Sequence, residues 1–155
     1  MITKPLNVGF ISFRFEGTDG VSLETSKWAQ ILEEMGHTCY YFSGLSDRPE
    51  DHSIVVPEAH FRHPEIRERY YRFFRMVVRN EDDTAWIHAR REYFREHISR
   101  FLREFNIDLL IPQNLLSFPL NIPLTLALTE LIAETSIPAI AATARCCASC
   151  AASGT

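Results

Sequence analysis

A short loop with two glycines near the N-terminus is the first part of this chain that could do chemistry. Gly17 and Gly20 flank Asp19 in segment 16–21, after an apolar run and before a segment with helical spacing. Glycine lets the backbone approach a ligand closely, and a helix start presents unpaired N–H groups and the positive end of its dipole. The loop lacks a complete dinucleotide or P-loop motif, so phosphate binding and a plain turn both stay open. Asp19 could bind a sugar hydroxyl or only stabilise the turn.

A second group of polar residues follows a buried strand. Gln113 and Asn114 come directly after the apolar run 107–112, which has the composition of a strand inside a parallel sheet. Ligands of open α/β sheets bind at the carboxyl ends of the strands, where these two amides would lie. They could instead only cap the next loop.

Pairs of metal-ligand residues occur twice, but neither pair has the partners that a metal site needs. His60 and His63 are three apart without a further ligand near them, and Cys147 and Cys150 have no second pair. A structural zinc site takes four ligands. The sequence therefore predicts no metal and no redox centre.

Strands and helices alternate along the chain, which predicts an α/β fold with an open, mainly parallel sheet and helices on both faces. The expected order of strands in the sheet begins 3-2-1-4-5. Ser22 is the expected cap of the first helix, whose apolar face is predicted to be Trp28, Ile31, Leu32 and Met35. The expected strands are 6–13, 38–42, 53–57, 107–112 and 137–141, and the expected helices are 22–36, 64–79, 84–106 and 121–135.

The charge and hydropathy of the chain bear on whether it binds nucleic acid or crosses a membrane. The chain has 155 residues and a net charge of −4, and residues 62–103 hold 11 of its 16 Lys and Arg residues against 7 acids. The net negative charge argues against a protein that binds nucleic acid. A helix that spans a membrane would need about 20 apolar residues, and the sequence has no run of this length. We therefore expect a cytoplasmic protein without a signal peptide. The arginines of 62–103, with Arg67, Arg75 and Arg79 expected on one helix, could form a solvated face, touch an acidic acceptor or make peripheral contact with an anionic membrane.

The end of the chain differs from the rest. Segment 142–155 has no apolar periodicity and consists largely of Ala, Cys, Ser and Thr. We expect a domain over 1–141 and an unstructured or out-of-family tail over 142–155, either a frameshift product or a genuine disordered tail. Without further strands, segment 137–140 would leave an exposed apolar edge that favours self-association.

The loop 16–22, the first strand and helix, and the strand 107–112 with its polar end resemble a known N-terminal domain. The pattern Asn121-Ile122-Pro123-Leu124 adds to this likeness. Over about 6–141 the chain resembles the N-terminal half of a GT-B glycosyltransferase of retaining family 4. The resemblance implies transfer of a hexosyl group from a nucleotide-sugar to a sugar or glycan acceptor, without a metal or other cofactor.

The resemblance also suggests site residues. It places Gly17, Asp19 and Gly20 in the loop that faces the cleft. It also places Gln113, Asn114 and Asn121, from the second half of the chain, where contacts with the acceptor are expected. The nucleotide-sugar would bind a C-terminal domain, which we expect to be missing here. No catalytic residue is assigned, and where the family has a His-rich stretch this sequence has Ala, Thr and Arg at 142–145. We expect the chain alone to be inactive; the alternatives are a non-catalytic sugar- or phosphate-binding fragment and a regulatory α/β module.

Overall fold

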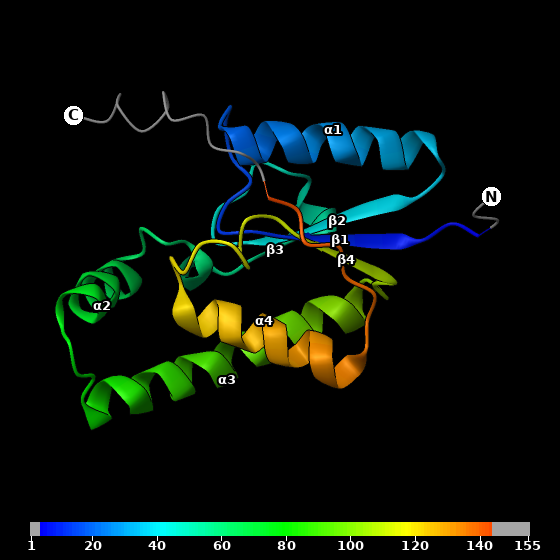
Figure 1. Ribbon diagram of the computed structural model, residues 1–155. Coiled ribbons are helices and arrows are strands. Elements are labelled where there is room, and N and C mark those ends of the chain that lie inside the picture. The colour runs from blue at the N-terminus through cyan, green and yellow to red at the C-terminus, as the bar shows by residue number, and fades with distance from the viewer. Residues whose placement is uncertain (1–3, 144–155) are drawn as a thin grey trace.

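A four-stranded parallel sheet lies between helices on both faces in the computed structural model, which describes residues 4–143 (Figure 1). This confirms the predicted α/β class. Helix α1 covers one face, and α3 and α4 lie against the other. The elements are β1 (Asn7–Ile11), α1 (Gly20–Glu34), β2 (Thr38–Ser43), β3 (Ser53–Val55), α2 (Pro64–Arg75), α3 (Glu81–Glu104), β4 (Leu109–Pro112) and α4 (Ile122–Thr135).

The strands lie in the order β3-β2-β1-β4, with every pair parallel. In the expected fifth position, segment 137–142 runs beside β4 and forms isolated bridges at Ala139 and Ala142 instead of a regular strand. Its backbone still bonds β4, since the Leu110 N–H donates to the Pro138 carbonyl and the Ile140 N–H donates to the Leu110 carbonyl, both at 2.9 Å. The order therefore agrees with the predicted 3-2-1-4-5 arrangement. The pairing includes Ala142, at the start of the expected tail, whereas 144–155 lie outside the described residues.

Alternation along β1 explains how one strand serves two cores. Val8 and Phe10 pack towards α1, whereas Ile11 packs towards α3 and α4. Gly9 lies on the second face, where an added Cβ would come 2.8 Å from the ring of Phe101. Helix α3 can therefore pack close to the sheet only because this position has no side chain.

The predicted apolar face of α1 is only partly right, and the predicted end of α2 is wrong. The fully buried residues of α1 are the small side chains Ser22, Thr25 and Ala29; of the predicted face, Leu32 packs against the core, while Ile31 and Met35 are 58% and 59% exposed. Small residues let α1 lie close to the sheet, so Ile31 and Met35 remain outside the core. Helix α2 ends at Arg75 instead of 79, so Arg79 lies in the linker to α3 and not on the helix with Arg67 and Arg75.

Polar contacts join α2 to α3. The buried carboxylate of Asp83 accepts a hydrogen bond from Arg69 at 2.6 Å, and Arg72 Nη2 lies 3.3 Å from its other oxygen. Glu65 accepts hydrogen bonds from Trp86 and Arg90. Burial alone would raise the pKa of Glu65, but these hydrogen bonds outweigh burial and hold the pKa below its usual value.

Candidate functional site

The carboxyl ends of β1 and β4 form the part of the sheet where a ligand site is expected. The two strands are neighbours, with Ile11 opposite Pro112. The chain leaves β1 to reach β2 on one side and returns later as β4 on the other, so the pair forms a topological switch point. The glycine loop and Gln113 both leave the sheet at this edge.

Asp19 caps helix α1. Its carboxylate accepts hydrogen bonds from the N–H groups of Val21 and Ser22, at 3.0 and 3.3 Å, and from the Ser22 hydroxyl at 2.9 Å. Arg14 lies 3.4 Å from the same carboxylate. The predicted cap, Ser22, is therefore wrong: Ser22 is buried inside the first turn and Asp19 holds the cap position. The carboxylate stabilises the helix start, and a contact from Asp19 to an acceptor remains a prediction.

Gly17 forms the turn of the loop next to the segment that connects β2 and β3. Its φ of 79° lies in the left-handed region that favours glycine, and its N–H donates to Asp47 at 3.0 Å. Gly20, in contrast, begins α1 and borders a pocket. The two predicted glycines thus have different roles, one in the turn and one at the edge of the pocket.

A pocket of about 500 Å³ opens between the first two turns of α1, the end of β4 and segment 140–143. Its wall combines apolar and polar groups, including Leu23, Lys27 and Trp28 with Gln113 at its base. The Trp28 indole N–H donates to Glu24 at 3.1 Å, which fixes the ring. Such a mixture of an aromatic ring, charged groups and an amide suits a polar molecule with apolar faces, such as a sugar.

Gln113 has the least usual environment of the predicted residues. Its backbone is fixed, because its N–H donates to the Ile11 carbonyl at 2.8 Å and its carbonyl accepts from the Ser12 hydroxyl at 3.1 Å. The side chain is fully buried, yet neither its oxygen nor its nitrogen has a hydrogen-bond partner among the residues that the structure describes. A buried polar group without a partner costs about 1–3 kcal/mol. Gln113 therefore stands out as a group that could satisfy its hydrogen bonds with a ligand.

The two predicted asparagines lie in different surroundings. Asn114 has a left-handed φ of 61°, and its N–H donates to the Ala142 carbonyl at 2.9 Å, so its backbone turns the chain out of β4. Asn121 is 1% exposed; its amide donates to the Glu58 carbonyl at 2.9 Å and its oxygen accepts from Leu124 at the start of α4. It borders a separate small pocket beside α2. The structure therefore gives Asn121 an internal role, and its contact with an acceptor remains a prediction.

His60 is a further candidate functional residue, although the sequence predicts it only as a loop residue. Burial, and then the nearby charges of Arg14 and Arg62, lower the pKa of its ring. Its Nδ1 accepts the Arg62 N–H at 2.9 Å, so the neutral ring carries its proton on Nε2 and can donate there. Only the fold reveals this environment, since it brings His60 beside the β1 loop. Across residues 4–143, no three His, Cys, Asp or Glu side chains group as metal ligands.

Comparison with known proteins adds one likeness. The chain is 26% identical over 129 residues to mannosylglucosylglycerate synthase of Thermotoga maritima, and the match covers 81% of this chain and 29% of that protein. The chain therefore spans less than a third of this relative's length. The likeness supports the resemblance to glycosyltransferases in general terms. No protein-family model and no solved structure matches the chain.

Proposed function

We propose that this chain forms the acceptor-side wall of a retaining hexosyltransferase of the GT-B family 4 type. In this reaction the bond from the sugar C1 to a nucleotide diphosphate breaks, and a bond from C1 to an acceptor hydroxyl forms on the same face. The relative's name contains a mannosyl, a glucosyl and a glycerate group. We therefore propose a glycosylated small acid, or a similar sugar, as the acceptor.

Gln113 is the observation that carries this proposal. Gln113 lines the pocket at the switch point of the sheet, and its buried amide has no hydrogen-bond partner among the described residues. Turned towards the pocket, this amide would donate to one sugar hydroxyl and accept from another. Gly20 keeps the edge of the pocket free of a side chain, and no atom lies within 4 Å of the position its Cβ would take. The Trp28 ring offers an apolar surface to the C–H face of a sugar.

The nucleotide-sugar is assigned to a second domain, as the resemblance implies. Catalysis needs groups placed around the reacting centre from both sides. We therefore expect the chain alone to bind an acceptor weakly and to transfer no sugar. Radiolabelled GDP-mannose and UDP-glucose, each mixed with glucosylglycerate as the acceptor, provide the test, since turnover by the chain alone would contradict this assignment.

Substitution of Gln113 by leucine tests the pocket. Removing both hydrogen-bonding atoms should weaken binding of the acceptor glucosylglycerate about tenfold, as measured by calorimetric titration. The free energy of unfolding should not fall, because the buried amide has no internal partner to lose. Gln30→Leu is the matched control, since Gln30 is exposed on α1 outside the pocket. Equal affinities of Gln113→Leu and the wild type would overturn the proposed site.

A further inference from the structure

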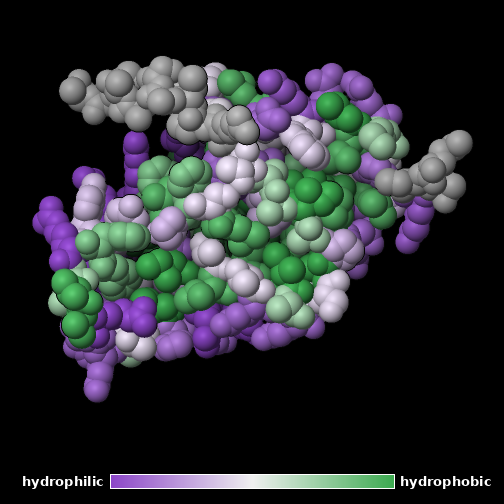
Figure 2. Space-filling view, in the orientation of Figure 1, coloured by the Kyte–Doolittle hydropathy of each residue, from purple (hydrophilic) through white to green (hydrophobic). Residues whose placement is uncertain are grey.

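An apolar surface lies at the end of α2, on the side of the sheet opposite α1. We call it the α2 tip, and Figure 2 shows strongly hydrophobic residues at this end of the molecule, with hydrophilic residues next to them. The tip continues from the last turn of the helix into the linker to α3. Its residues, with their exposed fractions, are Tyr71 (50%), Phe74 (59%), Met76 (46%), Val77 (102%) and Val78 (75%).

The packing of the fold does not explain why Val77 and Val78 are apolar. Val77 lies in the short linker 76–80, which contains no regular helix or strand. Val77 is wholly exposed and Val78 nearly so, so their side chains contribute little to the core. Polar residues would connect the helices equally well and would avoid exposing apolar surface to water. Adjacent exposed apolar side chains on a protruding turn therefore indicate a binding surface.

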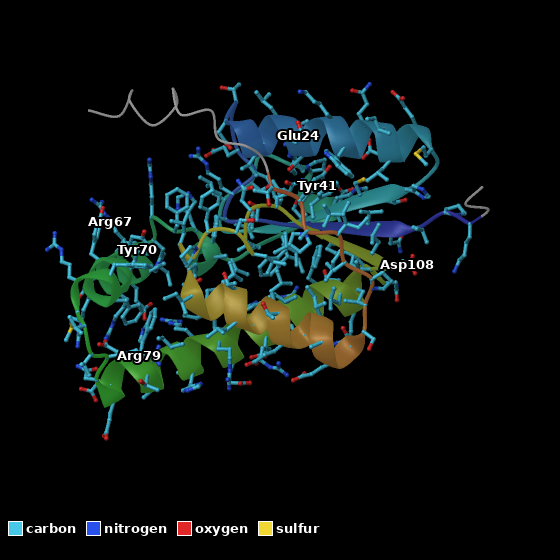
Figure 3. All side chains as sticks on the ribbon, in the orientation of Figure 1. Glu24, Tyr41, Arg67, Tyr70, Arg79 and Asp108 are labelled. Carbon is cyan, nitrogen blue, oxygen red and sulfur yellow. The ribbon has the colours of Figure 1, made fainter. Side chains whose placement is uncertain are left out.

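Arginines surround the tip. Segment 62–79 contains six arginines and two glutamates. Within residues 4–143, Arg67, Arg75 and Arg79 take part in no ion pair, whereas Arg91 and Arg95 of α3 pair with glutamates of α4. Figure 3 shows Arg67 and Arg79 at the same end of the molecule. The tip therefore carries positive charge, whereas the charges of Arg91 and Arg95 on α3 are balanced by glutamates.

Helix α2 is held so that this surface faces outwards. Its inner side contacts α3 through Phe73, whose ring lies 6.1 Å from that of Trp86, and through the Arg69–Asp83 pair. On its outer side, the Arg67 guanidinium lies over the Tyr71 ring at 5.8 Å. A pocket of about 250 Å³ beside the tip is lined mainly by apolar side chains, together with Arg79 and Asp83. Arg69 and Arg72 already pair with the Asp83 carboxylate, so Arg79 is the cation of this pocket that has no ion-pair partner among the described residues.

We propose that the α2 tip docks on the surface of an anionic lipid bilayer. Val77, Val78 and Phe74 would enter the headgroup layer, while the unpaired arginines bind lipid phosphates. A protein partner fits less well, because a stable interface buries about 800 Å² on each side, and the tip offers only a few residues around one turn. No helix of the described residues is long and apolar enough to cross a membrane, so the contact would be peripheral.

Sedimentation with vesicles tests this proposal on the full chain. Vesicles of about 30% phosphatidylglycerol in phosphatidylcholine should bind the protein at about 0.1 M salt, and pure phosphatidylcholine should bind it far less. Arg75→Gln with Arg79→Gln should weaken binding roughly 25-fold, at about fivefold for each arginine. Val77→Ser with Val78→Ser should weaken it at least about tenfold. These side chains are exposed, so both double variants should fold.

Exposed residues elsewhere serve as matched controls. Arg100→Gln with Arg103→Gln removes two charges from the end of α3, and Ile31→Ser with Met35→Ser removes two exposed apolar side chains from α1. Both controls should bind anionic vesicles like the wild type, apart from the small effect of net charge. The proposal is overturned if the wild type does not bind these vesicles, or if the controls weaken binding as much as the tip variants. It is also overturned if the tip variants change only the oligomeric state, which would assign the surface to a second copy of the chain.

Discussion

Replacement of Asp83 by alanine removes the carboxylate that joins α2 to α3. Asp83 lies in the first turn of α3 and is 1% exposed. Arg69 donates a hydrogen bond to one of its oxygens at 2.6 Å, while Arg72 approaches the other at 3.3 Å without forming a hydrogen bond. The variant would leave two arginines facing an apolar contact between the helices without their shared partner.

The size of the loss follows from the exposure of these arginines. Removing one partner of a fully buried ion pair costs about 3–5 kcal/mol, because the remaining charge is left buried. The side chains of Arg69 and Arg72 are 26% and 38% exposed, so water can hydrate each of them in part. We therefore expect a loss of about 2–3 kcal/mol in the free energy of unfolding.

Urea unfolding followed by circular dichroism measures this loss, with Asp82→Ala as the matched control. Asp82 belongs to the same first turn but is exposed, so its loss should cost only about 0.3–1 kcal/mol through the helix dipole. The midpoint should therefore fall much further for Asp83→Ala, with little change in the slope. If the two variants lose the same stability, Asp83 acts only through the dipole and does not clamp the two helices.

Two further predictions concern the stability of the fold. Gly44→Ala should destabilise the protein by at least about 1–3 kcal/mol in urea, because the new Cβ would lie 2.1 Å from the backbone nitrogen of His60; Gly20→Ala, which meets no atom within 4 Å, should not, and equal losses would refute the steric reason. Burial opposes the effect, but the hydrogen bond from Trp86 lowers the pKa of Glu65 in the folded protein. Glu65 should therefore stabilise the fold fully above its unfolded pKa of about 4.3 and lose this contribution as the pH falls through the folded value. In Glu65→Gln the free energy of unfolding should fall less steeply between neutral and acidic pH, and an unchanged pH dependence would exclude this linkage.

The spacing of hydrophobic residues along the sequence predicted the strands and the long helix α3. The expected helix 84–106 corresponds to α3, which buries Phe94, Ile98 and Phe101 fully because it packs large residues against both the sheet and α4. The strand order also followed, because parallel strands joined by helices have few possible arrangements. The candidate site was predicted at the edge of the sheet for the same reason.

Contacts between distant segments explain what the pattern did not predict. Trp28 and Ile31 have helical spacing, but α1 meets the sheet through smaller residues, so the choice of face depended on how closely the helix could approach. The unpaired amide of Gln113 and the environment of His60 depend on neighbours far away in sequence. Spacing alone also extended α2 through Val77, although the helix ends at Arg75.

Nuclear magnetic resonance of the chain titrated with the acceptor glucosylglycerate tests the proposed sugar pocket most directly. The side-chain amide of Gln113 and the indole N–H of Trp28 lie at the pocket, so their signals should shift together and saturate at one affinity. The side-chain amide of Gln30 is exposed on α1 outside the pocket and should stay unchanged. A shift at Gln30 without one at Gln113, or no shift at either pocket residue at saturating sugar, would contradict the proposed acceptor site.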